Sequence, residues 1–316
     1  MLGRDFISIA DFRPDEIQKI LDTAITLKRR GRPELLSGRT LAMIFEKPSL
    51  RTRVSFQVAM SDLGGHAIYL SHEEVGLSVR EPVKDVARVL SRFVDVIVAR
   101  TYLHSTIVEL AEYASVPVIN ALSDLEHPCQ ALADLLTILE RFDTISGVRL
   151  AYIGDGNNVA SSLLLGAAML GARMTLACPV GYEPPGDLME AAAGYAHESG
   201  GAITLVRSPE DAVAQADVVY TDVWTSMGQD NERQRRQRDF AGYTVNLALM
   251  RAAAPHAIIM HDLPAHRGEE IEDEALESPQ AVVFDQAENR LHAQRALIAL
   301  LLAEPELSEW EVASSA

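Results

Sequence analysis

The sequence contains only two cysteines, fewer basic than acidic residues and no long apolar run. Cys129 and Cys178 lie in unlike sequence contexts, so they do not suggest a disulfide framework. The 28 lysines and arginines against 45 aspartates and glutamates give a net charge of -17, which argues against a nucleic-acid partner. No apolar run reaches membrane-spanning length, and the N-terminal residues lack the apolar core of a signal peptide. We therefore expect a cytoplasmic protein that binds neither nucleic acid nor membrane.

Length and composition are those of a globular protein with two domains. A chain of 316 residues is long enough for two cores, and 48% hydrophobic and 23% charged residues are ordinary values. Apolar runs that alternate with amphipathic segments predict two parallel-sheet α/β units, with ligands at the carboxyl ends of the strands. Strands are expected at residues 41–45, 66–71, 94–100, 117–121, 148–153, 173–179, 202–206, 217–223, 257–263 and 281–284. Loops are expected at 73–81 and 224–240.

The stretch from Leu41 to Met60 organises the first unit. Five apolar residues predict a buried strand, Pro48 ends it, and the sequence Ser-Leu-Arg-Thr-Arg at 49–53 opens a helix. Free backbone N–H groups, two hydroxyls and two guanidiniums then surround one point, which favours a bound phosphate. The glycines of a Walker loop are absent, so a nucleotide hydrolase is not indicated.

Other polar clusters follow the predicted strands, and each has a simpler explanation when taken alone. The sequence Gly-Asp-Gly-Asn-Asn at 154–158 hints at dinucleotide binding, but Val159 stands where the third glycine belongs. His261, Asp262 and His266 could be metal ligands, but their spacing fits no common motif, so we expect no metal. Cys129 has no paired base that the sequence indicates, so it is a poor candidate nucleophile.

Taken together, these segments resemble the carbamoyltransferases, and within them the ornithine carbamoyltransferases, over nearly the whole chain. FEKPSLRTRVSF resembles the carbamoyl-phosphate signature, with Leu50 where threonine is common, and HPCQALADLLT resembles the second signature. GDGNNV, DVWTSMG, HDLPAHRGEE and FDQAENRLH resemble the remaining motifs, in the same order and with similar spacing. The aspartate-using relatives lack the DVWTSMG loop, so Asp222, Ser226 and Met227 favour ornithine.

The resemblance implies an architecture of two parallel-sheet α/β domains bridged by two helices. Residues 1–140 would bind carbamoyl phosphate, with a C-terminal helix at about 287–316 packing back on them, and residues 141–286 would bind ornithine. The helices beginning at His127 and Ala287 are the candidate bridges. Similar enzymes are homotrimers or multiples of trimers and need no cofactor.

The resemblance also assigns roles to residues. Carbamoyl phosphate would be bound by Ser49, Leu50, Arg51, Thr52, Arg100, His127, Gln130, Leu263 and Arg290. L-Ornithine would be bound by Asn158, Asp222, Ser226 and Met227. Arg100, His127, Asp262 and Arg290 would carry the catalysis, with donors directed at the carbonyl oxygen while the neutral δ-amine attacks. Citrulline and phosphate would be the products.

Two departures from the family pattern leave alternatives open. The usual His-Cys-Leu-Pro is His-Asp-Leu-Pro here, with Asp262 in place of the cysteine, and Gly76 aligns with a frequent glutamine that contacts phosphate. Asp262 leaves room for another amine acceptor such as putrescine, or for a non-catalytic protein that binds carbamoyl phosphate or ornithine. A third alternative, a dehydrogenase that uses NAD, is poorly supported, because the sequence lacks both the glycine fingerprint and a convincing ribose-binding acid.

Overall fold

The computed structural model describes residues 1–77, 80–226 and 230–313, which form two compact units. Unit 1 comprises residues 1–136 and 288–316, and unit 2 comprises residues 137–287. Helices α6 (Pro128–Phe142) and α13 (Val283–Leu302) each contain a boundary between the units. Among the described residues, no helix is long and apolar enough to cross a membrane.

Unit 1 is built on a parallel sheet with the strand order β2-β1-β3-β4. The strands are β1 (Thr40–Phe45), β2 (His66–Ser71), β3 (Val96–Arg100) and β4 (Val118–Leu122). The central strands β1 and β3 are almost wholly buried, which explains their continuous apolar sequences. Phe45 at the end of β1 is in register with Arg100 at the end of β3, so the loops after both strands start at one edge.

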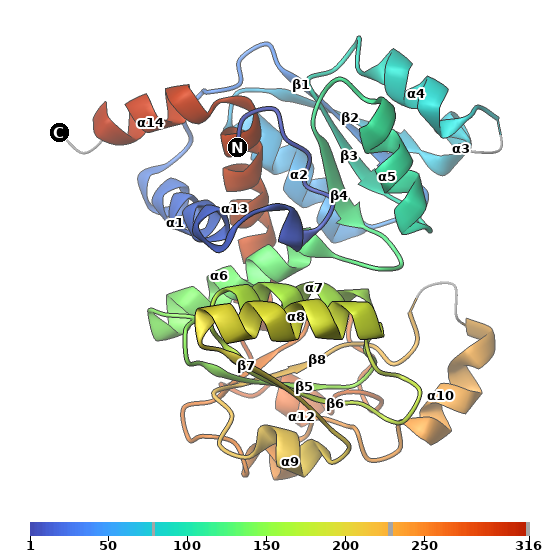
Figure 1. Ribbon diagram of the computed structural model, residues 1–316, viewed down its shortest axis with the longest axis vertical. Coiled ribbons are helices and arrows are strands. Elements are labelled where there is room, and N and C mark those ends of the chain that lie inside the picture. The colour runs from blue at the N-terminus through green and yellow to red at the C-terminus, as the bar shows by residue number, and fades with distance from the viewer. Residues whose placement is uncertain (78–79, 227–229, 314–316) are drawn as a thin grey trace. The chain divides into compact units, whose positions relative to one another are not determined.

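Helices cover the sheet of unit 1 (Figure 1). Side chains of α4 (Val83–Leu90) and α5 (His104–Tyr113) form one core cluster with alternate residues of β1 and β3. The other helices are α1 (Pro14–Arg30), α2 (Leu50–Asp62), the short α3 (His72–Val75), α14 (Glu304–Ala313) and the one-turn η1 (Ile9–Asp11). The prediction that residues 73–81 form a loop is therefore wrong at its start, because Ser71 opens a helical turn that ends at Gly76 in a left-handed conformation.

Unit 2 contains a second parallel sheet, with the order β7-β6-β5-β8-β9. The strands are β5 (Arg149–Ile153), β6 (Arg173–Ala177), β7 (Ala202–Val206), β8 (Val218–Thr221) and β9 (Ile258–Met260). Helices α7 (Asn158–Met169) and α8 (Gly186–Ser199) lie on one face, and α9 (Pro209–Val213) and α12 (Asp273–Leu276) on the other (Figure 1). The remaining elements are η2 (Asp230–Glu232), α10 (Arg233–Asp239) and α11 (Leu247–Met250). The fold class predicted from the sequence, two parallel-sheet α/β domains, is confirmed.

Two predicted elements of unit 2 are wrong. Residues 224–240 are not all loop, because α10 forms where Arg236 and Phe240, one turn apart, are both buried. Residues 281–284 are not a strand: Ala281 makes a single bridge to Ile259, and α13 begins two residues later. A short apolar run without a partner strand does not distinguish a strand from the first turn of a helix.

Candidate active site

The N-terminus of α2 is where the sequence predicts an anion site in unit 1. Ser49 is the N-cap, and its Oγ accepts a hydrogen bond from the backbone N–H of Thr52 at 3.4 Å. The first turn contains no acidic residue, so the positive end of the helix dipole is not compensated there. Arg51 is half-buried and Leu50 is exposed. Backbone donors and a guanidinium at one helix end suit a phosphate group.

The expectation of two guanidiniums around one point is corrected for Arg53. Its guanidinium carbon lies 3.9 Å from the centroid of the Tyr69 ring on β2, a cation–π contact on an exposed side chain. Lys47, which sequence reasoning missed, is a different cation in the same turn. Burial and then the charge of Arg100 lower the pKa of the Lys47 ammonium.

Arg290 of α13 joins two other segments of unit 1. Its Nη1 donates to Gln130 Oε1 at 2.6 Å, and its Nη2 donates to Thr52 Oγ1 at 3.1 Å. Gln130 Nε2 in turn donates to Asp134 Oδ1 at 2.8 Å. All four side chains are buried. The guanidinium therefore fixes the positions of a hydroxyl and an amide that come from elements far apart in the sequence.

Arg100 and His127 lie at the carboxyl end of the same sheet. Arg100 ends β3, and its backbone C=O accepts from the N–H of Glu46 at 2.8 Å, which ties β3 to the turn after β1. His127 directly precedes α6 and is buried. Burial, with the positive charges of Arg290 and Arg100, lowers the pKa of His127 well below its usual range. The neutral imidazole is therefore the favoured form of His127, and it has a single N–H to donate.

Cys129 does not have the surroundings of a nucleophile. Its Sγ donates to the backbone C=O of Asn120 at 3.3 Å, and burial raises the pKa of the thiol to about 12. The thiolate is the nucleophilic form of cysteine, so this side chain is inert at neutral pH.

Asp222 and Asn157 are hydrogen-bonded to each other at the carboxyl ends of β8 and β5 in unit 2. Asn157 Nδ2 donates to Asp222 Oδ2 at 2.7 Å, and Asn157 Oδ1 accepts from the backbone N–H groups of Val159 and Ala160. The backbone N–H of Val223 donates to Asp222 Oδ1 at 2.6 Å. Asn157, which the sequence analysis did not single out, is thus in direct contact with Asp222. Asn158 begins α7 and is half-buried.

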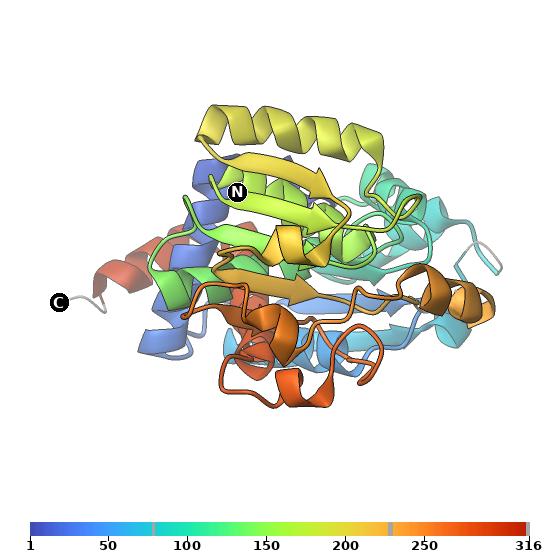
Figure 2. The same cartoon turned by 90° about the horizontal axis from the view of Figure 1, so that it is seen from below.

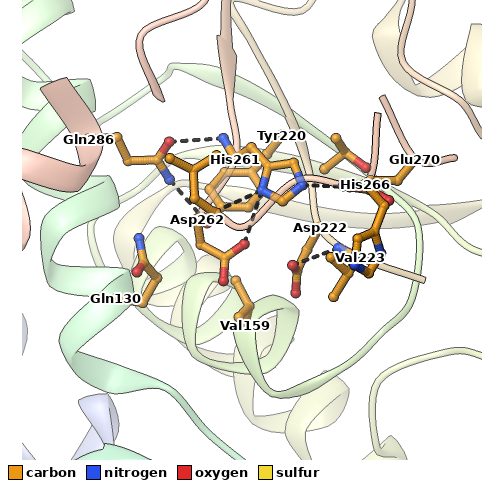
Figure 3. A network of polar contacts seen from close by, with 12 residues as sticks. Gln130, Val159, Tyr220, Asp222, Val223, His261, Asp262, His266, Glu270 and Gln286 are labelled. Atoms are coloured by element: carbon orange, nitrogen blue, oxygen red, sulfur yellow. Dashed lines mark hydrogen bonds and ion pairs between the residues drawn. The ribbon is translucent and has the colours of Figure 1, made fainter. Parts of the chain in front are cut away.

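Figure 3 shows the fully buried imidazole of His261 between two carboxylates. Its Nε2 lies 3.0 Å from Glu270 Oε1, and its Nδ1 lies 3.3 Å from Asp262 Oδ1. Burial lowers the pKa of His261, but the carboxylates of Asp262 and Glu270 outweigh burial and raise it to about 10. The backbone N–H of Leu263 donates to Nδ1 at 2.9 Å, a contact that only the neutral ring accepts and that therefore opposes the rise.

Asp222 and Asp262 form a pair of close carboxylates. Atoms of Asp222, His261 and Asp262 that could bind a metal all lie within 4.8 Å of one another. Burial, followed by the neighbouring charge of Asp262, raises the pKa of Asp222 well above its usual range. Like charges at this range oppose each other's ionisation, whereas the charge of His261 and the hydrogen bond from Asn157 favour ionised Asp222.

The remaining predicted residues of unit 2 lie nearby in the chain. Ser226 is half-buried at the end of the segment that follows Asp222, and Met227 lies outside the described residues. Leu263 has a positive φ of 59° and is followed by a cis peptide bond to Pro264. The structure places Leu263 against the core of unit 2.

Two groups of side chains in the described part of the chain have the composition of a cation site. One is Asp222, His261 and Asp262, and the other is His266, Glu269 and Glu270. The three candidate ligands considered from the sequence are therefore divided between two groups. Carboxylate oxygens dominate both, which would suit a hard divalent cation better than a soft one.

Two family models match the chain in succession. The carbamoyl-P binding domain of aspartate/ornithine carbamoyltransferase matches residues 4–140, and the Asp/Orn binding domain of the same family matches residues 146–301. The ornithine carbamoyltransferase of Pyrococcus abyssi is 54% identical over 304 residues, which are 95% of this chain and 96% of that protein. The anabolic ornithine carbamoyltransferase of Pyrococcus furiosus is 53% identical over 306 residues, covering 96% and 97% of the two chains.

Solved structures agree with this similarity. The structure of ornithine carbamoyltransferase from Pyrococcus furiosus has a TM-score of 0.93 at 52% identity, covering 95% of this chain and 97% of that chain. That from Thermus thermophilus has a TM-score of 0.87 at 46% identity, covering 96% and 100%.

Proposed function

Because this chain belongs to the aspartate/ornithine carbamoyltransferase family, we propose that it transfers the carbamoyl group of carbamoyl phosphate to the δ-amine of L-ornithine. The products are L-citrulline and phosphate. The observation that carries the proposal is identity above 50% over nearly the full length of ornithine carbamoyltransferases.

In the proposed reaction, unit 1 binds carbamoyl phosphate. Ser49, Arg51 and Thr52, together with the N–H groups at Leu50 and beyond, hold the phosphate at the start of α2. A planar guanidinium matches two phosphate oxygens at once, which an ammonium does not. Gln130, held by Arg290, binds the carbamoyl amide.

Arg100, His127 and Arg290 act on the carbonyl group. Negative charge develops on the carbonyl oxygen as the amine attacks, and donors already in place stabilise it. His127 serves as a neutral donor, consistent with the low pKa that burial and the neighbouring arginines impose. Leu263 supplies a further contact with carbamoyl phosphate, as the resemblance implies.

Unit 2 binds ornithine. Asp222 pairs with the α-ammonium, and Asn158, Ser226 and Met227 complete the contacts with the amino-acid end, as the resemblance implies. We add Asn157, because it donates directly to Asp222. An ammonium ion next to Asp222 favours the ionised form and so lowers the pKa of the carboxyl group.

Asp262 acts on the attacking amine. The δ-nitrogen forms a bond to the carbonyl carbon, the bond from that carbon to the phosphate oxygen breaks, and the nitrogen loses a proton. Asp262 accepts that proton and becomes a neutral carboxyl group, and before the transfer its carboxylate is held beside His261, which Glu270 holds from the other side. The reaction so described uses no metal and no organic cofactor.

We propose a homotrimer, or a multiple of trimers, as the assembled form. Unit 1 exposes several large apolar side chains on and around α4 and α5. Contact of such side chains with water is unfavourable, and a group of them on a surface is typical of a protein–protein interface. They are Val89, Phe93, Tyr102, Leu103 and Val108. A contact with a second copy would bury them.

Citrulline formation by the purified protein is the direct test. Ornithine and carbamoyl phosphate should give citrulline and phosphate in equal amounts. Putrescine is the comparison, because Asp262 adds a second carboxylate beside Asp222 and so favours a second acceptor with two amines. Turnover of putrescine alone would assign the other acceptor, and binding of carbamoyl phosphate without turnover of any amine would assign a non-catalytic binder.

A further inference from the structure

Arg236 differs from the other arginines of α10. The segment Arg233–Asp239 contains four arginines, which the sequence presents as a solvated charge run. Three of them are exposed and Arg236 is buried. Burying a guanidinium is costly unless every donor direction finds an acceptor, so its partners identify what the position is for.

The guanidinium of Arg236 bonds to three segments of unit 2. Nη1 donates to Asp155 Oδ2 at 2.6 Å and to the backbone C=O of Trp224 at 2.8 Å. Nε donates to Glu232 Oε2 at 3.0 Å, and the guanidinium carbon lies 5.0 Å from the centroid of the Tyr182 ring. The side chain therefore connects α10 with the turn after β5 and with the segment after β8.

Both connected segments carry residues of the proposed ornithine site. Asp155 is two residues before Asn157, which donates to Asp222. Trp224 lies midway between Asp222 and Ser226. The guanidinium of Arg236 thus links the two segments through Asp155 and Trp224, and the Asn157–Asp222 hydrogen bond links them a second time. Two links restrict the relative position of the segments more than one.

The surroundings of Arg236 favour a role at the ligand end of the sheet. In Figure 2 the arrowheads of the unit 2 strands point toward the end at which α10 lies. A cavity of about 460 Å³ adjoins the ion pair and is lined by Asp155, Tyr182, Glu232 and Arg236, among others. Burial raises the pKa of Asp155, and the charge and hydrogen bond of Arg236 oppose that rise without cancelling it, so the guanidinium favours the ionised carboxylate.

We propose that Arg236 is a positioning residue for the amino-acid substrate: it sets the relative position of residues 154–158 and 222–226 without touching the ligand. The inference rests on the proposed function, because it assigns those segments to ornithine. It predicts a loss confined to the amino-acid end of the reaction. Displacement of a binding group by about 1 Å is enough to cost on the order of 100-fold in rate.

The experiment compares Arg236→Gln and Arg236→Lys with Arg238→Gln, which removes an exposed charge from the same helix. We expect Arg236→Gln to raise KM for ornithine by about 10- to 100-fold while KM for carbamoyl phosphate stays constant. Binding of norvaline, which lacks the δ-amine, should weaken by the same factor. The ornithine KM of Arg236→Lys should lie between those of the parent and Arg236→Gln. An ammonium can still pair with Asp155 but does not reproduce the several directed hydrogen bonds of the planar guanidinium. Arg238→Gln should match the parent.

Several outcomes would overturn the inference. Equal increases of both KM values in Arg236→Gln would mean that Arg236 acts only on overall folding. Loss of carbamoyl phosphate binding accompanied by a lower melting temperature would mean the same. If Arg236→Gln does not fold, a normal KM for ornithine in Arg236→Lys decides against the role. A parent protein that makes no citrulline overturns the proposed function as well, whereas a parent that makes citrulline beside a variant with unchanged ornithine KM overturns this inference alone.

Discussion

Arg51 and Arg53 are two residues apart but have different surroundings. Arg53 lies over the ring of Tyr69, whereas Arg51 is half-buried in the first turn of α2 beside the N-cap Ser49. Spacing along a helix explains the difference, since residues two apart point to different sides. The two arginines therefore serve as test and control for the phosphate site.

We expect Arg51→Lys to weaken the use of carbamoyl phosphate. Loss of a bidentate, charge-assisted contact costs about 1.5–3 kcal/mol, or roughly 10- to 150-fold in kcat/KM for carbamoyl phosphate. Steady-state kinetics with carbamoyl phosphate as the varied substrate measure it. Arg53→Lys should change this constant little, and similar losses in the two variants would contradict the assignment of Arg51.

Asp262 gives a prediction about pH. A carboxylate close to the δ-ammonium favours its charged form and raises its pKa, by roughly 1–3 units for a partner at short range. The reactive neutral amine therefore appears at higher pH than it would without the carboxylate. We expect the parent to have a more alkaline optimum than Asp262→Cys, in pH–rate profiles at saturating carbamoyl phosphate.

Two results would contradict the prediction for Asp262. Profiles that overlay would mean that Asp262 does not act on the amine. If the parent makes no citrulline at any pH and Asp262→Cys does, the parent is a binding protein. Asp222 shows that charge matters here, because the neighbouring Asp262 contributes to its raised pKa.

At the scale of elements, a buried ion pair fixes α13 against α2. Arg295 Nη1 donates to Asp62 Oδ2 at 3.1 Å, and both side chains are buried. Arg290, which contacts Thr52 of α2, lies on α13 five residues before Arg295. The pair therefore holds the helix that carries a proposed catalytic residue.

Asp62→Asn should destabilise unit 1 by about 3–5 kcal/mol, because it leaves the Arg295 charge buried without a countercharge. Urea unfolding followed by circular dichroism measures the change. Arg32 also pairs with Asp62, at 3.2 Å, but its side chain is 72% exposed. Arg32→Gln should therefore cost about 1 kcal/mol or less, and an equal cost for both variants would contradict this account.

At the scale of the whole molecule, the exposed apolar side chains of unit 1 bear on assembly. Light scattering after size exclusion should give a mass of three times the 34.5 kDa chain, or a multiple of that value. Phe93→Asp places a charge where an apolar contact is proposed and should lower the mass. Val180→Asp is the control, because Val180 is equally exposed but belongs to unit 2. A monomeric parent would contradict the trimer.

The sequence by itself determined the architecture and most of the candidate residues. Alternation of buried strands with amphipathic helices is a local pattern, so strands such as β2 and β7 were predicted with their observed bounds. Ser49, Arg51 and Thr52 were identified because a strand, a proline and a helix start are contiguous in the chain. The candidate site residues, and the domain boundaries near 140 and 286, remain predictions that mutagenesis and truncation would test.

Only the tertiary structure decided which side chains meet. Asn157 and Asn158 are equivalent in sequence, but the helix cap directs Asn157 toward Asp222. Arg236 was hidden in a charge run, because burial of one arginine among four depends on which side of α10 packs inward. The pKa values of Asp222 and His261 arise from charges up to 40 residues away in the chain, which approach only where parallel strands end at one edge of a sheet. Residue type and order are local properties, whereas proximity is a property of the fold.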